Sequence, residues 1–120
     1  GTGRASDTGT GPGLGHTFNV PLPHGTPRPA FLDAFRAGLE KAAAASRPEL
    51  VLLSAGFDAH KDDPIGSLGL ETEDYGELTR LVRGIAETHC GGRLASCLEG
   101  GYDLDALAGS VALHLEGLLA

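Results

Sequence analysis

The residues most able to do chemistry lie in "SAGFDAHKDDPIG", residues 54–66, where one histidine and three aspartates follow an apolar run. Asp58 and His60 are two positions apart, so an extended backbone would direct both side chains to the same side. A carboxylate and an imidazole at this spacing suit Zn²⁺ or a related divalent ion. Two residues do not complete such a site, because a catalytic zinc usually has three protein ligands and a water. The alternative is a solvated turn that binds no metal.

Two further features of the sequence bear on this choice. Asp62 and Asp63 stand before Pro64, and aspartate before proline is common in turns, which favours a structural role for both. Tyr102 follows two glycines, which would let the backbone approach a ligand closely and leave the phenol hydroxyl free to reach it. The alternative for Tyr102 is a residue that starts a helix and packs against its neighbours.

An alternation of extended and helical patterns would position these residues. The extended patterns are residues 16–22, "ELVLLSAG" (49–56) and "RLASCLEG" (93–100), and apolar residues at helical spacing follow each of them. Thr26, Thr72 and Asp103 are expected to cap the three helices. This βαβαβα order predicts an α/β fold, a parallel sheet with helices on both faces.

The carboxyl ends of the expected strands are where a ligand would bind, because ligands of open α/β sheets lie outside that edge. The segments at these ends are "PLPHG" (21–25), "GFDAHKDDP" (56–64) and "EGGYD" (99–103). We therefore expect the aspartate-rich segment and the Gly-Gly-Tyr sequence to meet at one edge of the sheet. This convergence favours the metal-site hypothesis over the solvated turn.

Length, charge and composition narrow the class of protein. The 120 residues correspond to one domain at most, and the net charge of −7 argues against nucleic acid or an anionic membrane as partner. No apolar run approaches the roughly 18 residues that span a bilayer, and no signal peptide opens the chain, so we expect a cytoplasmic protein. The glycine-rich residues 1–15 predict a loop. The absent initiator methionine indicates the end of a longer protein.

The two cysteines, Cys90 and Cys97, are seven positions apart. This is not the Cys-x2-Cys spacing of a zinc site, and two cysteines do not make a disulfide framework. We expect one to end a helix and the other to lie in a strand, both as reduced structural thiols.

The motifs "SAGFDAHKDDPIG" and "LEGGYDLDALAGS", with the opening "GTG…GHTFNVPLP", resemble the C-terminal part of the histone deacetylase family. The likeness is greatest to its bacterial and class II branch, which includes acetylpolyamine amidohydrolases. It spans essentially the whole chain, so residues 1–120 would be the C-terminal part of a deacetylase-like domain. The resemblance implies an arginase-like three-layer sandwich, of which this chain would hold about three βα units.

The resemblance also implies roles for individual residues. Asp58 matches a zinc ligand of the family, and another divalent metal such as Fe²⁺ could take the place of zinc. Tyr102 matches the tyrosine whose hydroxyl polarises the amide carbonyl. Ile65 matches an apolar residue that lines the acyl-lysine channel, and Gly100 and Gly101 match glycines that flank it.

For the other residues of segment 54–66, the resemblance does not imply a role in metal binding. His60 falls at a variable place of the family's loop, so the family does not support it as a ligand. Asp63 and Pro64 match an Asp-Pro that shapes the loop. The family's other two zinc ligands, an Asp-x-His, and its catalytic His-His pair would lie upstream of Gly1.

The implied function is zinc-dependent hydrolysis of N-acetyl amides, on acetyl-lysine or acetylated polyamines, by a longer enzyme of which this chain is the C-terminal portion. The 120-residue chain alone is then expected to be inactive. The negative charge fits a cationic substrate, and a preference for arginine over lysine hints at a bacterial source. The alternative is a truncated, catalytically incompetent α/β fragment or an interaction module. A flavodoxin-like nucleotide-binding domain is disfavoured, because no phosphate motif follows the first expected strand.

Overall fold

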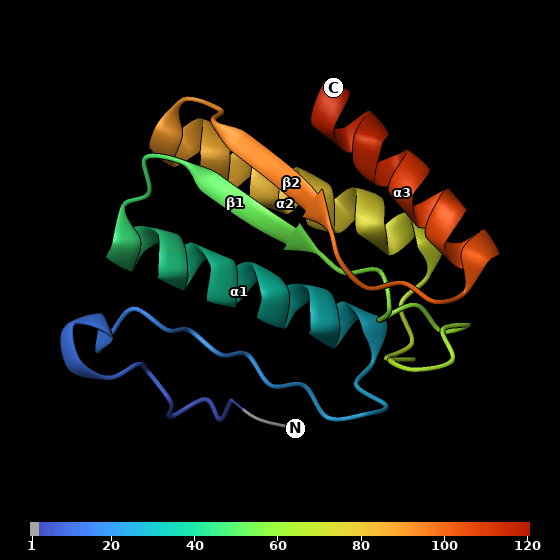
Figure 1. The fold of residues 1–120 in the computed structure, drawn as a ribbon, viewed down its shortest axis with the longest axis horizontal. Helices are drawn as coiled ribbons and strands as arrows, with labels where there is room; N and C mark the ends of the chain where they lie inside the picture. Colours follow the sequence, from blue (N-terminus) through green and yellow to red (C-terminus); the bar gives the residue numbers. More distant parts are fainter. Residues whose placement is uncertain (1–2) are drawn as a thin grey trace.

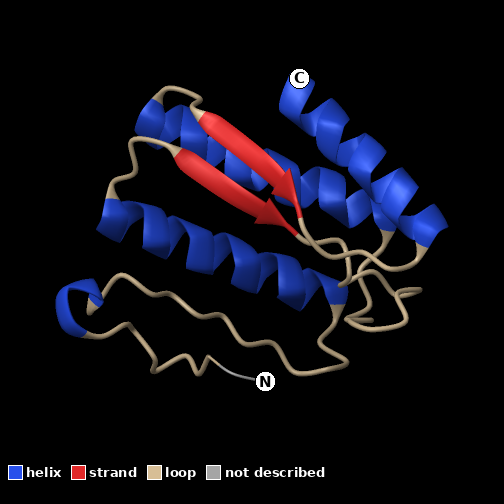
Figure 2. Cartoon of the chain, in the orientation of Figure 1, coloured by secondary structure: helices blue, strands red, loops and turns tan. Residues whose placement is uncertain are grey.

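A computed structural model describes residues 3–120 (Figure 1). After a short 3₁₀ turn at Gly11–Gly13, the regular elements are α1 (Arg28–Ser46), β1 (Val51–Ala55), α2 (Thr72–Cys90), β2 (Leu94–Leu98) and α3 (Leu104–Leu119). The two strands are parallel and in register from Val51 opposite Leu94 to Ala55 opposite Leu98. An α/β fold built on a parallel sheet is therefore confirmed (Figure 2).

All three helices pack against one face of the sheet. Alternate residues of a strand point to opposite faces, and Ala55 belongs to a buried cluster with Phe57 and Tyr75. Residues from each helix pack on this cluster, including Phe31 of α1, Leu78 of α2 and Leu107 of α3. The core thus lies between the sheet and the helices, immediately behind the segment that contains Asp58.

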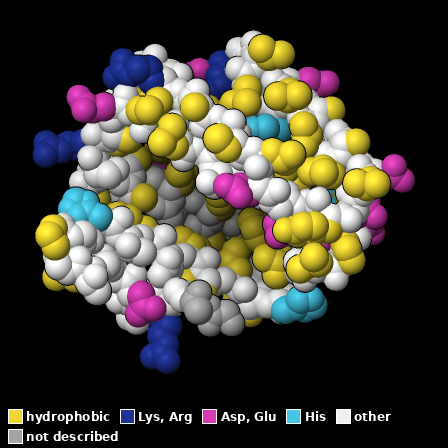
Figure 3. All heavy atoms as spheres, viewed as in Figure 1, with side chains coloured by type: hydrophobic (Ala, Val, Ile, Leu, Met, Phe, Trp, Pro, Cys, Tyr) yellow, Lys and Arg dark blue, Asp and Glu magenta, His cyan; other side chains and the backbone are white. Residues whose placement is uncertain are grey.

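The other face of the sheet has no helix over it among residues 3–120. Leu52 of β1 is 75% exposed, and Cys97 of β2 is also exposed. Figure 3 looks onto this side and shows hydrophobic side chains at its surface. The expected second helical layer is therefore not formed by this part of the chain.

The strand expected at residues 16–22 does not form. These residues run extended beside α1 (Figure 1), and no described strand pairs with them. The apolar side chains of Phe18, Val20 and Leu22 line a crevice against Phe31 and Phe35 of α1 instead. The apolar alternation correctly predicted an extended backbone with one packed side. An extended segment becomes a strand only when a neighbouring strand exchanges backbone hydrogen bonds with it.

Two of the three expected helix caps are also wrong. Thr26 donates its hydroxyl to the Pro23 carbonyl at 2.6 Å and leaves Pro27 at the start of α1. In α2 the cap is Glu71, whose partner in a reciprocal capping box is Asp74. Only Asp103 caps its helix as expected, accepting from the Ala106 N–H at 2.8 Å.

A buried histidine ties α3 to α2 and β2. Thr79 of α2 donates its single hydroxyl proton to the Tyr75 carbonyl at 2.7 Å, so it can only accept from His114 Nδ1, also at 2.7 Å. The other ring nitrogen, Nε2, then accepts from the Ser96 hydroxyl of β2 at 2.9 Å. Burial lowers the pKa of the His114 imidazole, which agrees with this neutral ring.

Both cysteines are free, as expected: Cys90 ends α2 and is buried, whereas Cys97 is exposed on β2. Among the residues described, no helix has the length and apolar character needed to cross a membrane.

Candidate active site at the carboxyl edge of the sheet

Asp58 lies two residues beyond Gly56, just past the end of β1, and the backbone on its amino side is firmly held. The Phe57 N–H donates to the Gly100 carbonyl at 2.8 Å, which joins the loops that follow the two strands. The Phe57 carbonyl accepts from the buried Tyr75 hydroxyl at 2.9 Å. Because the Phe57 and Tyr75 rings also pack at 5.1 Å, Asp58 begins from a fixed point at the edge of the sheet.

The Asp58 carboxylate rests directly against the other loop. A Cβ built on Gly100 would lie 2.8 Å from Asp58 Oδ2 and 2.9 Å from its Cγ, closer than real Cβ atoms approach. Asp58 is partly exposed, and within residues 3–120 its carboxylate accepts no side-chain or backbone hydrogen bond. A carboxylate with both oxygens available has the chemistry of a ligand for a hard or borderline divalent ion.

Asp58 is a single candidate ligand. No group of three or more His, Cys, Asp or Glu side chains able to hold a metal occurs in the described part of the chain. Asp58 therefore has the donor type and the accessibility that a metal ligand needs, and any further ligands would have to come from outside the described residues.

His60 does not share a side with Asp58, contrary to the spacing-based expectation. The backbone at Asp58 and Ala59 is a turn rather than extended, and His60 is buried. Its Nδ1 accepts from the Asp62 N–H at 3.2 Å, which leaves Nε2 to donate to the Thr72 hydroxyl at 3.1 Å. With both nitrogens engaged and the ring stacked on Tyr75, His60 is a structural residue.

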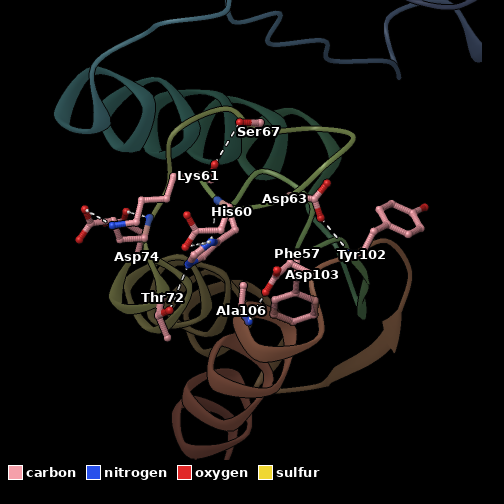
Figure 4. Close-up of polar contacts among 12 residues, drawn as sticks. Phe57, His60, Lys61, Asp63, Ser67, Thr72, Asp74, Tyr102, Asp103 and Ala106 are labelled. Atoms are coloured by element: carbon pink, nitrogen blue, oxygen red, sulfur yellow. Dashed lines mark hydrogen bonds and ion pairs between the residues drawn. The ribbon is translucent and has the colours of Figure 1, made fainter.

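Asp63 is the most densely bonded acid of the segment. It is only 4% exposed, and its Oδ1 accepts from the backbone N–H groups of Ile65 at 2.8 Å and Gly66 at 2.9 Å. Its Oδ2 accepts from the Tyr102 N–H at 2.8 Å (Figure 4). Burial acts to raise the pKa of this carboxyl, but hydrogen bonds from the surrounding backbone N–H groups outweigh it and lower the pKa. The structural role expected of Asp63 is in keeping with these contacts, but its bond to Tyr102 was not anticipated.

The backbone of Tyr102 is held by the hydrogen bond to Asp63, whereas its ring is half exposed. Its side chain is 53% exposed and, in Figure 4, projects away from the bonded cluster. Gly101 before it has φ +137°, and a Cβ there would lie 2.6 Å from Leu107 and 3.2 Å from Phe57, so only glycine fits. Tyr102 thus lies two residues before the start of α3 with its ring half exposed, which disfavours the alternative of a packed helix-start residue.

The predicted site residues thus come together on two loops. Ile65, 70% exposed, lies on the Asp58 loop, while Gly100, Gly101 and Tyr102 lie on the loop after β2. The third segment, residues 21–25, reaches the same end of the molecule in Figure 1, since α1 begins there. Sequence reasoning missed Tyr75 and Thr72 as supports of the Asp58 loop, because neither has a local pattern that reveals a contact so far along the chain.

Comparison with known proteins identifies the family to which this fold belongs. Residues 1–118 match the histone deacetylase domain, and the chain belongs to that family. Histone deacetylase 14, chloroplastic, of Arabidopsis thaliana is 41% identical over 119 residues, which cover 99% of this chain and 28% of the plant protein.

Solved structures of related proteins support the same family assignment. The crystal structure of the HDA15 HD domain superposes with a TM-score of 0.87 at 33% identity, over 98% of this chain and 33% of that one. An acetylpolyamine aminohydrolase from Burkholderia pseudomallei gives a TM-score of 0.82 at 28% identity, over 99% of this chain and 33% of that one. The fold is that of the histone deacetylase family, and this chain spans roughly a third of the length of such relatives.

Proposed function

We propose that this chain is the C-terminal portion of a zinc-dependent deacetylase that hydrolyses N-acetyl amides of lysine side chains or polyamines. The observation that supports the proposal most directly is the Asp58 carboxylate, accessible and without a hydrogen bond among residues 3–120, seated against Gly100 in a chain of this family. Because the chain spans only part of its relatives, the activity of the whole protein is the proposal.

In this proposal Asp58 is the ligand that the chain contributes to the metal, with Zn²⁺ preferred and Fe²⁺ as an alternative. The remaining ligands and a histidine base would come from sequence upstream of Gly1. The bound metal would supply Lewis-acid polarisation of the amide carbonyl and a water of lowered pKa.

The chain's own residues would orient the substrate and stabilise charge. The Tyr102 hydroxyl, on an exposed ring beside Gly100 and Gly101, would donate a hydrogen bond to the carbonyl oxygen as negative charge develops on it. Preorganisation matters here, because a donor already in place needs no reorganisation during the reaction. Ile65 and the two glycines would flank the methylene stem of the acetylated lysine or polyamine, which is apolar and suits residues without charge.

The proposed substrate class is supported by the net charge and by the names of the relatives. The net charge of −7 favours cationic substrates, which include lysine-rich peptides and polyamines alike. One structural relative is named for acetylpolyamines, while others are named histone deacetylases. An acetyl-lysine peptide and a monoacetylated polyamine should therefore be assayed side by side.

The experiment that tests the proposal is a zinc titration of Asp58→Ala in the full-length protein, beside the matched control Asp62→Ala. Asp62 lies four residues away, and its carboxylate is exposed to solvent. Loss of a ligand should weaken zinc binding by at least about tenfold, since even residues outside the ligand shell contribute that much. Asp62→Ala should retain the parent affinity.

Two results would contradict the proposal. One is equal zinc affinity in the two variants. The other is zinc-dependent turnover of an acetylated peptide by the isolated 120-residue chain, which we expect to be inactive because its described residues supply a single metal ligand.

A further inference from the structure

The Asp63 carboxylate joins the two loops on which the proposed chemistry depends. Asp63 follows β1 and Tyr102 follows β2, 39 positions later, yet Asp63 Oδ2 accepts from the Tyr102 N–H at 2.8 Å (Figure 4). The other oxygen, Oδ1, accepts from Ile65 and Gly66 in its own loop. One buried side chain thus closes its own loop and holds the neighbouring one.

The loop that Oδ1 closes is also the loop that fixes Asp58. The Ser67 N–H donates to the Asp58 carbonyl at 3.0 Å. Gly66 lies so close to the same carbonyl that a Cβ there would collide with it. Residues 65–67 therefore connect Asp63 to the backbone of Asp58, which the bond from the Phe57 N–H to the Gly100 carbonyl also holds independently of Asp63.

Tyr102 depends on Asp63 because it has few other restraints. Two glycines precede it, its ring is half exposed, and in the described part of the chain its only hydrogen bond runs from its N–H to Asp63. Beyond it, Asp103 caps α3 and so fixes the chain on the far side. The direction in which the Tyr102 side chain leaves the backbone is therefore set between Asp63 and that cap.

A carboxylate is required for this arrangement. Its two oxygens are acceptors only, so all three N–H groups find a partner, and bonds to an ionised acceptor are the stronger kind. An asparagine of the same shape has one acceptor oxygen, which satisfies two N–H groups on the side of Ile65 and Gly66 but only one on the side of Tyr102, so its NH₂ would face the Tyr102 N–H. One side of the link would then face donor to donor.

We infer that Asp63 is a positioning residue that sets the Tyr102 hydroxyl relative to Asp58, and so acts on the chemical step without touching substrate or metal. The inference rests on the proposed function for its catalytic consequence. The hydrogen-bonded link itself does not depend on that function.

The test compares Asp63→Asn with the matched control Asp62→Asn in the full-length protein. Asp62 is adjacent and exposed, and within residues 3–120 the hydrogen bond of Tyr102 runs to Asp63 and not to Asp62. Asp63→Asn should lower kcat by about 10–100-fold, as residues that orient a site typically do, with KM and zinc content near those of the parent. Asp62→Asn should stay within about twofold of the parent in all three quantities.

A double-mutant cycle separates positioning from general destabilisation. In a Tyr102→Phe background the hydroxyl is already gone, so adding Asp63→Asn should reduce kcat by no more than about threefold. A parent-like kcat in Asp63→Asn would overturn the inference. So would an equal loss of kcat in both backgrounds, because Asp63 would then act through something other than Tyr102.

Where Asp63→Asn fails to fold, Asp63→Glu replaces it, since it keeps both acceptor oxygens but moves them by one methylene. A kcat lowered at least about threefold at unchanged KM supports the positioning role, and a parent kcat overturns it.

A readout without activity distinguishes failure of this inference from failure of the proposed function. If the parent turns over neither acetylated peptide nor acetylated polyamine, the proposed function fails and the link is tested by amide hydrogen exchange. Faster exchange at the Tyr102 N–H in Asp63→Asn than in Asp62→Asn supports the link, and identical exchange overturns it.

Discussion

Replacing Gly100 by alanine should weaken metal binding without weakening the fold. The φ of Gly100 lies outside the positive range, so alanine is not excluded by the backbone. The obstacle is the Asp58 side chain, because the added Cβ would lie 2.8 Å from Oδ2, 2.9 Å from Cγ and 3.2 Å from Oδ1. Ordinary contact begins near 3.5 Å, so the carboxylate must move by about 0.5–0.7 Å.

A displacement of this size is large for a metal ligand and small for the fold. Metal–ligand distances are held to within about 0.2 Å, so we expect zinc affinity to fall by about 10–100-fold. Asp58 is partly exposed and can shift toward solvent. Replacing glycine by alanine at a compatible position stabilises by about 0.4–1 kcal/mol through the unfolded chain. The thermal midpoint should therefore stay level or rise while zinc affinity falls.

The assay is a zinc titration against a competing chromophoric chelator, with thermal unfolding measured on the metal-free protein. Gly84→Ala in α2 is the matched control, because a Cβ at that position meets no atom within 4 Å. It should raise stability by about 0.5–1 kcal/mol, the usual gain over glycine inside a helix, and leave zinc affinity unchanged. If Gly100→Ala binds zinc within about twofold of the parent, the carboxylate is not a ligand held in this position.

Three further outcomes are expected. Tyr102→Phe should lower kcat by about 10²–10³-fold, as loss of an oxyanion donor does. Because its ring is half exposed, the thermal midpoint should not change; activity within about threefold of the parent would refute the assignment. Tyr75→Phe should cost about 1–2 kcal/mol in the free energy of unfolding, measured by urea titration, because the Phe57 carbonyl keeps only a 3.4 Å contact with an N–H. Burial acts to raise the pKa of Asp74, but the paired Arg28 guanidinium outweighs it and lowers the pKa. Its contribution is therefore present above the unfolded-state pKa of about 3.9 and lost as pH falls through the lower folded-state value. The stability difference between the parent and Asp74→Asn should shrink between about pH 5 and pH 2, and a constant difference would contradict the pairing.

Much of the framework could be predicted from local sequence patterns. The apolar runs at residues 49–56 and 93–100 became β1 and β2, and the apolar repeats that follow them became α2 and α3. Asp103 caps α3 as its position predicted. These features follow from the periodicity of side chains along a few consecutive residues, which is a property of the chain itself.

The position of Asp58 and Tyr102 at one edge of the sheet could also be predicted from the sequence, because parallel strands end on the same side. Only the tertiary structure decided what each neighbour does. His60 turns inward to Thr72, residues 16–22 pack on α1 without a partner strand within residues 3–120, and Asp63 accepts from the backbone 39 positions away. Such contacts depend on which donors, acceptors and apolar surfaces meet once the chain is folded. A pattern of neighbouring residues does not specify partners that are distant in the sequence.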